Sequence, residues 1–208
     1  MSKVLLIHGY SCGIKYSFFR EKRLDGSYKL IKEKFQTNCE NRLFWWTNLD
    51  LNLNFWQCLN PKNVIGLYFR EKAETEKQEN QAKLYQELLD YKPDFVVAHS
   101  MGCHFLAKTL ENYGHNTELK KIVFLASDDD FDSNNTFFKN SKLEILSYSC
   151  FWDYTLWLSC VLNFKIRAGL FGYQDVKIKN IFAAEMSFVP HNYYIASDFL
   201  ETKIYPKL

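Results

Sequence analysis

The chain has few residues that interrupt regular structure, with only 8 glycines and 4 prolines among its 208 residues. Collagen-like and low-complexity disordered chains need far more of both, so these classes are excluded. Hydrophobic residues make up 47% of the sequence, which is enough to fill the core of a globular protein. Because this length is typical of one domain, we predict a single domain over residues 1–208.

The sequence also lacks an excess of either charge and any long apolar segment. Its formal net charge at pH 7 is +2, whereas nucleic-acid-binding domains are usually strongly basic, so we expect no nucleic-acid partner. A membrane-spanning helix needs ~20 apolar residues, and the chain has no uncharged stretch of that length. The apolar run at residues 4–7 is too short for a signal peptide. We therefore expect no transmembrane segment and a cytoplasmic protein.

None of the 6 cysteines forms a C-x-x-C pair or has a histidine at a spacing typical of zinc sites. We predict free thiols in a reducing compartment and no metal site. The sequence also has no glycine-rich phosphate loop and no dinucleotide-binding fingerprint. We therefore expect no cofactor.

Short apolar runs alternate with helical patterns along most of the chain. Continuous apolar runs predict strands that are covered on both faces, at residues 3–8, 63–69, 95–99, 121–126, 143–148 and 177–184. Apolar residues at helical spacing predict helices within residues 71–91 and over residues 101–113, the latter ending at Gly114. This alternation predicts an α/β fold: a mostly parallel, doubly wound sheet of about six strands, flanked by helices. Two segments interrupt the pattern: an aromatic-rich insertion at 37–61 and a loop at 128–141.

The clearest chemical signal is Ala98-His99-Ser100-Met101-Gly102, between a predicted strand and a predicted helix. A serine hydroxyl is a weak nucleophile unless a tight turn holds it beside a base. Such a turn needs small residues two positions before and after the serine, and Ala98 and Gly102 meet this need. The motif departs from G-x-S-x-G only in having Ala98 in place of the first glycine.

A second motif, His8-Gly9-Tyr10, follows the first predicted strand. The backbone N–H groups of Tyr10 and Met101 would together form an oxyanion hole, which binds the negative charge that develops on a substrate oxygen. Of the other histidines near the serine, His99 is predicted to be structural, and no particular role is expected of His104.

With these two motifs the chain resembles the α/β-hydrolase superfamily over nearly all its length, as a small member similar to serine esterases and lipases. The resemblance implies a minimal form of the fold, without the two antiparallel strands that usually begin it. It also implies a triad in the order serine, acid, histidine. Ser100 would be the nucleophile, and His191, in a loop after the last predicted strand, would be the base. The acid would be Asp153, or one of the cluster Asp128, Asp129 and Asp130.

Two aromatic segments are candidates for the walls of a substrate pocket. One contains Trp45 and Trp46, and the other contains Trp152 and Trp157. They favour a small-molecule substrate with an apolar acyl group. Large aromatic residues also fill protein cores, and the sequence leaves both interpretations open.

These features predict a serine hydrolase that cleaves a carboxylic ester, or a thioester or amide, through an acyl-enzyme. Two alternatives remain open at this point. One is a catalytically silent binding or interaction protein with the same fold, and the other is acyl transfer or perhydrolysis in the same site.

Overall fold

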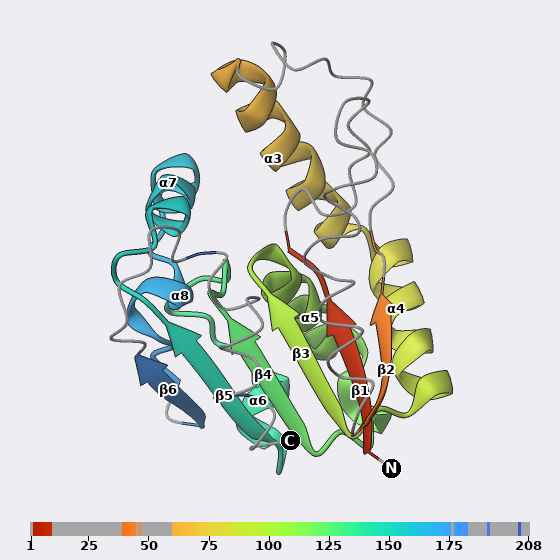
Figure 1. The fold of residues 1–208 in the computed structure, drawn as a ribbon. Coiled ribbons are helices and arrows are strands. Elements are labelled where there is room, and N and C mark those ends of the chain that lie inside the picture. Colours follow the sequence, from red (N-terminus) through yellow and green to blue (C-terminus); the bar gives the residue numbers. More distant parts are fainter. Residues whose placement is uncertain are drawn as a thin grey trace.

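A central sheet of six parallel strands organises the protein (Figure 1). The computed structural model describes residues 2–9, 39–44, 46, 60–175, 177–182, 191 and 204. The strand order is β2-β1-β3-β4-β5-β6, and every neighbouring pair is parallel. The strands are β1 (Ser2–Ile7), β2 (Cys39–Phe44), β3 (Phe95–His99), β4 (Lys121–Leu125), β5 (Glu144–Ser149) and β6 (Ile178–Phe182).

The strand order changes direction at β1, which lies between β2 and β3. Parallel α/β sheets bind ligands in the crevice at the carboxyl ends of the strands beside such a switch point. Ile7 of β1 pairs with Ala98 of β3, so the chain leaves both strands at the same edge. This brings His8 and Ser100 close to each other.

Helices cover both faces of the sheet, as expected of a doubly wound fold. Leu5 and Ile7 of β1 belong to a core cluster with side chains of α4 (Gln78–Tyr91) and α5 (Met101–Tyr113). The intervening residues Val4 and Leu6 belong to a second cluster, with side chains of α7 (Tyr154–Asn163) and α8 (Ala168–Phe171). Because successive strand residues point to opposite faces, a continuous apolar run serves both clusters. The predicted fold class is confirmed.

Several predicted elements agree closely with the observed ones. Strand β3 and helix α5 have the predicted bounds, and the N–H of Gly114 at the end of α5 donates to the carbonyl of Leu110. Strands β4, β5 and β6 differ from the predicted ranges by one residue at the bounds that can be compared, and the predicted end of β6, residues 183–184, lies outside the described residues. The predicted loop at 128–141 contains only one short helix, α6 (Thr136–Asn140), and the short 3₁₀ helix η1 (Gly114–Asn116) follows α5.

The predicted strand at 63–69 is wrong, because these residues lie in helix α3 (Pro61–Glu76). The side-chain oxygen of Asn60 accepts a hydrogen bond of 3.0 Å from the backbone N–H of Lys62, and Pro61 occupies the first helical position. Asparagine as a cap and proline after it are both helix-start signals. The predicted helix within 71–91 is in fact the end of α3 and all of α4, separated by the extended residue Lys77.

Strand β2 was not predicted, and it lies within the predicted insertion at 37–61. It pairs with β1 alone at the edge of the sheet, and its sequence, Cys-Glu-Asn-Arg-Leu-Phe, is polar. An edge strand is less covered than a central one and tolerates such residues, so the apolar pattern that reveals buried strands is missing here.

Among the helices of the described ranges, none combines the length and the apolar character of a membrane span.

Candidate active site

Ser100 occupies the turn between β3 and α5, with φ 53° and ψ −124°. A positive φ is rare for a residue with a Cβ atom, and it persists only where the surrounding structure holds it. The Ser100 N–H donates to the Leu125 carbonyl at 2.9 Å, and the Ser100 carbonyl accepts from Asp128 N–H at 3.1 Å and Cys103 N–H at 2.9 Å. These bonds fix the serine at the carboxyl edge of the sheet.

The small residues around the serine are required by close backbone contacts. A Cβ atom on Gly102 would lie 2.4 Å from the carbonyl oxygen of His8, where the turn after β1 crosses the start of α5. A Cβ atom on Gly9 would lie 2.8 Å from the Cβ of Ser100. Ala98 is completely buried. The spacing of small residues in the motif therefore reflects steric limits in the structure.

The structure brings Ser100, His191 and Asp153 into one hydrogen-bonded chain. The Nε2 atom of His191 lies 2.9 Å from Ser100 Oγ, and its Nδ1 atom lies 2.8 Å from Asp153 Oδ2. An ionised carboxylate can only accept, so Nδ1 carries the proton and Nε2 of the neutral ring is free to accept from the serine hydroxyl. All three side chains are buried.

Asp153 is held in place by the helix that follows it. Its Oδ1 atom accepts hydrogen bonds of 3.1 Å from the backbone N–H groups of both Thr155 and Leu156, at the start of α7. The positive end of a helix dipole and two N–H donors favour a negatively charged carboxylate. One oxygen of Asp153 thus caps the helix while the other contacts His191.

The aspartate cluster has other partners in the structure. Asp128 accepts a hydrogen bond of 3.0 Å from the Tyr68 hydroxyl and forms an ion pair of 3.3 Å with Arg167. Asp130 pairs with Lys165 and Arg167. Of the acids that the sequence left open, it is Asp153 that the structure places against His191.

His99 supports the backbone of His191. Its Nε2 atom lies 2.9 Å from the His191 carbonyl oxygen, and because a carbonyl only accepts, Nε2 is the protonated nitrogen. Burial, and next the neighbouring His191, lower the pKa of His99 to about 3, so this ring is neutral. The sequence indicated a structural role for His99, but nothing in it identified His191 as the residue supported.

His8 and Trp46 shape the turn after β1. The Trp46 indole N–H donates to the His8 carbonyl at 3.0 Å, and the two rings stack with centroids 5.2 Å apart. Burial lowers the pKa of His8 to about 4, against the opposite effect of its hydrogen bond to the Gly9 carbonyl. Trp46 is therefore part of the scaffold beneath the turn.

Of the two predicted oxyanion-hole residues, only Met101 lies in the described part of the structure. It is the first residue of α5, next to Ser100, and the first N–H groups of a helix have no partner within the helix. Tyr10 lies outside the described residues, so its role stays a prediction.

Cys103, three residues after Ser100 on α5, is buried, and this burial raises the pKa of its thiol, which disfavours the reactive thiolate.

A charged network centred on the buried His104 links α3, α5 and the loop after β4. The His104 ring donates to Asp129 Oδ1 at 2.9 Å and to Glu76 Oε1 at 2.7 Å. Burial opposes the charged form of His104, but these two hydrogen bonds outweigh it and raise its pKa to about 9. The imidazolium thus holds α3 beside the site, a role that its position in the sequence does not indicate.

The four tryptophans that were predicted to contact substrate differ in their exposure and position. Trp152 is 60% exposed and Trp157 is 40% exposed, and Trp46 is buried in the scaffold. Trp45 lies outside the described residues. None of the three described tryptophans lines the small cavity beside Ser100, and contacts of all four with substrate stay predictions.

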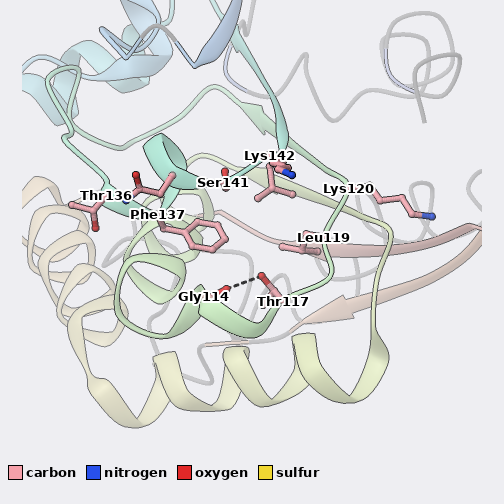
Figure 2. Close-up of a pocket in the computed structure, with 10 residues that line it drawn as sticks. Gly114, Thr117, Leu119, Lys120, Thr136, Phe137, Ser141 and Lys142 are labelled. Carbon is pink, nitrogen blue, oxygen red and sulfur yellow. Dashed lines mark hydrogen bonds between the residues drawn. The ribbon is translucent and has the colours of Figure 1, made fainter.

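Within the described residues, one cavity lies at the carboxyl ends of the strands and another lies at their amino ends. A cavity of about 60 Å³ opens beside Ser100, between α3 and α7. A larger one, of about 620 Å³, lies among the end of α5, α6 and the start of β5, with Lys120, Phe137 and Lys142 at its wall (Figure 2). The larger cavity is at the amino ends of β4 and β5, where parallel α/β sheets do not usually bind ligands. The small cavity is therefore the candidate substrate site.

Within the described residues, no group of histidine, cysteine and acidic side chains is arranged to hold a metal ion.

No known family model matches the sequence, and no curated protein matches it. Solved structures do resemble it. A Listeria innocua gene product matches with a TM-score of 0.51 at 11% identity, over 97% of this chain and 91% of that one. A lipase-esterase related protein from Clostridium acetobutylicum matches with a TM-score of 0.47 at 11% identity, over 96% and 90% of the two chains. A Thermoplasma acidophilum protein described as a predicted CIB-like hydrolase matches with a TM-score of 0.49 at 11% identity, over 93% and 79%.

The strand order and the serine turn after β3 define the class of fold. An all-parallel sheet in this order, with a strand–serine–helix turn after the third strand in sequence, is the core sheet of an α/β-hydrolase fold. The chain has the α/β-hydrolase fold. At these low identities, the likeness to solved structures concerns the fold and not the chemistry.

Proposed function

We propose that the protein is a serine hydrolase that cleaves carboxylic esters through an acyl-enzyme. The observation that carries this proposal is the chain of two hydrogen bonds, 2.8 Å and 2.9 Å long, from Asp153 through His191 to Ser100. It combines a nucleophile, a base and a group that orients the base, which is the minimum arrangement for acyl transfer to a serine.

The first step forms the acyl-enzyme. His191 Nε2 removes the proton from Ser100 as Oγ attacks the ester carbonyl carbon, and Asp153 stabilises the imidazolium that results. The N–H of Met101, together with the predicted contribution of Tyr10, donates to the oxygen that gains negative charge. Nε2 then returns the proton to the departing alcohol as the carbon–oxygen bond breaks.

The second step releases the acid. Water donates a proton to His191 Nε2 while it attacks the acyl carbonyl, and Ser100 leaves with the proton from the imidazolium. The positive φ of Ser100 and its three backbone hydrogen bonds support this role, because they hold Oγ within reach of Nε2 through both steps.

The test combines labelling with turnover. A fluorophosphonate probe is expected to label the wild-type protein covalently, and p-nitrophenyl acetate is expected to be hydrolysed. Ser100→Ala should abolish the labelling and reduce turnover to background. Ser141→Ala, at the opposite edge of the sheet, is the matched control and should keep both. A Ser100→Ala protein that still labels and turns over would overturn the proposal.

A further inference from the structure

The cavity beside Ser100 has apolar side walls contributed by two helices far apart in the sequence. Val64 and Ile65 of α3 form one wall, and Leu156, Leu158 and Leu162, from α7, form the other. Its volume is about 60 Å³, and a cavity needs ~10–15 Å³ by this measure to hold one water molecule. There is thus space for roughly four to six non-hydrogen atoms.

The position of the cavity indicates which part of an ester it receives. The leaving alcohol must accept a proton from His191 Nε2, so it has to lie beside that ring. The described residues that line the cavity include Ser100 but neither His191 nor Asp153. The cavity therefore lies on the side of the serine away from the leaving group, where the acyl chain extends.

Polar groups in the lining of the cavity are bonded to one another. The Tyr68 hydroxyl lies 3.0 Å from Asp128 Oδ2 and 2.8 Å from Ser159 Oγ, and it accepts from Asn163 Nδ2 at 2.7 Å. Arg167 balances the charge of Asp128 across 3.3 Å. A ligand group with its own donor or acceptor would have to break these bonds, so the cavity favours an apolar group.

The same network sets the width of the cavity. Tyr68 belongs to α3, whereas Ser159 and Asn163 belong to α7, and Lys72 of α3 also bonds to Asn163. These bonds tie the two helices together beside the cavity. A longer acyl chain would have to separate the helices and expose buried polar groups, which is costly.

On the basis of the proposed function, we propose that this cavity is the acyl-binding pocket and that it selects short, apolar acyl groups. It accommodates acyl groups of up to about six carbons, as its volume allows. Ile65 and Leu162 are its size-determining residues, and the bonds of Tyr68 to α7 limit how far the two helices can separate.

The experiment measures kcat/KM for p-nitrophenyl esters from acetate to dodecanoate, because these share a leaving group and differ only in the acyl chain. In the wild type, kcat/KM is expected to be highest at or below about six carbons and to fall at least ~10-fold by about ten carbons. Leu162→Ala and Ile65→Ala should each raise the decanoate-to-acetate ratio by ~10-fold or more. Val161→Ala is the matched control, because that side chain is on the same helix but 67% exposed, and it should leave the ratio unchanged.

The outcomes separate this proposal from the proposed function. Two results would contradict the acyl pocket but not the proposed hydrolase activity, provided that Ser100 is labelled. One is a kcat/KM that is highest on long acyl chains, and the other is the same chain-length profile in the wild type, Leu162→Ala and Ile65→Ala. No labelling and no turnover on any ester would remove both. Circular dichroism of each variant identifies any that fails to fold. Because the two enlarging variants lie on different helices, one of them still tests the proposal if the other does not fold.

Discussion

Gly102 lies so close to His8 that a methyl group on Gly102 would approach the His8 carbonyl oxygen to 2.4 Å. The contact joins the turn after β1 to the first turn of α5, which are the two segments that flank the serine. A backbone atom cannot move aside as the end of a flexible side chain can. The contact therefore couples the position of Ser100 to that of β1.

This contact predicts that Gly102→Ala destabilises the protein by about 1–3 kcal/mol, because the added methyl must displace backbone. The turnover of p-nitrophenyl acetate should fall as well, since Ser100 moves with the turn. Gly66→Ala is the control. Gly66 is an exposed residue of α3 and nothing lies within 4 Å of a Cβ placed there, so that variant should gain about 0.5–1 kcal/mol. Urea denaturation measures both, and equal stabilities of the two variants would contradict the steric argument.

Asp153→Asn tests the assigned acid. Asparagine can still cap α7, so the fold is expected to persist, but it cannot stabilise the imidazolium of His191. We expect kcat to fall on the order of 10³–10⁴-fold. Asp132→Asn, on an exposed loop residue of the aspartate-rich segment, should keep wild-type kcat. A near-normal kcat in Asp153→Asn would contradict this assignment and favour a residue of the Asp128–Asp130 cluster as the acid.

His99→Asn should lower kcat by ~10–100-fold with a smaller change in KM, because it removes the bond to the His191 carbonyl that positions the base. The variant should also change the response to acid. The folded pKa of about 3 is below the ordinary value of 6.5, so the unfolded chain binds the proton more readily. The contribution of His99 to stability is therefore present above pH ~6.5 and is lost as the pH falls toward 3. Urea denaturation between these values should show a shallower pH dependence in the variant; an unchanged slope would contradict the assignment.

The protein should become less stable at alkaline pH, because His104 loses its proton there. Its folded pKa of about 9 exceeds the ordinary 6.5, so the folded chain holds the extra proton between these values. The contribution is complete below pH ~6.5 and is lost as the pH rises through 9. His104→Gln should lose this pH dependence in urea denaturation between pH 6.5 and 9.5. A wild-type protein whose stability stays level over that range would contradict the charged bridge to Glu76 and Asp129.

Elements with a strong local pattern were predictable from the sequence. The buried strand at 95–99 and the helix at 101–113 have a continuous apolar run and a helical apolar spacing, respectively, and both were placed with their observed bounds. The apolar run at 63–69 misled the prediction, since a short run of this kind fits either a strand or a buried helix face. There, the helix-start signal of Asn60 and Pro61 was more informative than the apolar run. Edge strand β2 had no such run and was missed.

The sequence by itself determined the order of the chemistry along the chain: a serine between a strand and a helix, a later acid after a strand, and a last histidine. It did so because the turn around Ser100 depends on neighbouring residues, whose sizes can be read directly. Only the tertiary structure decided that Asp153 meets His191, that His99 supports it, and that α3 and α7 enclose a cavity at Ser100. The two contacts of His191 join residues 38 and 92 positions apart, and the Tyr68–Asn163 bond between α3 and α7 joins residues 95 positions apart. Whether such residues meet depends on how the helices pack on the sheet, which no local pattern encodes.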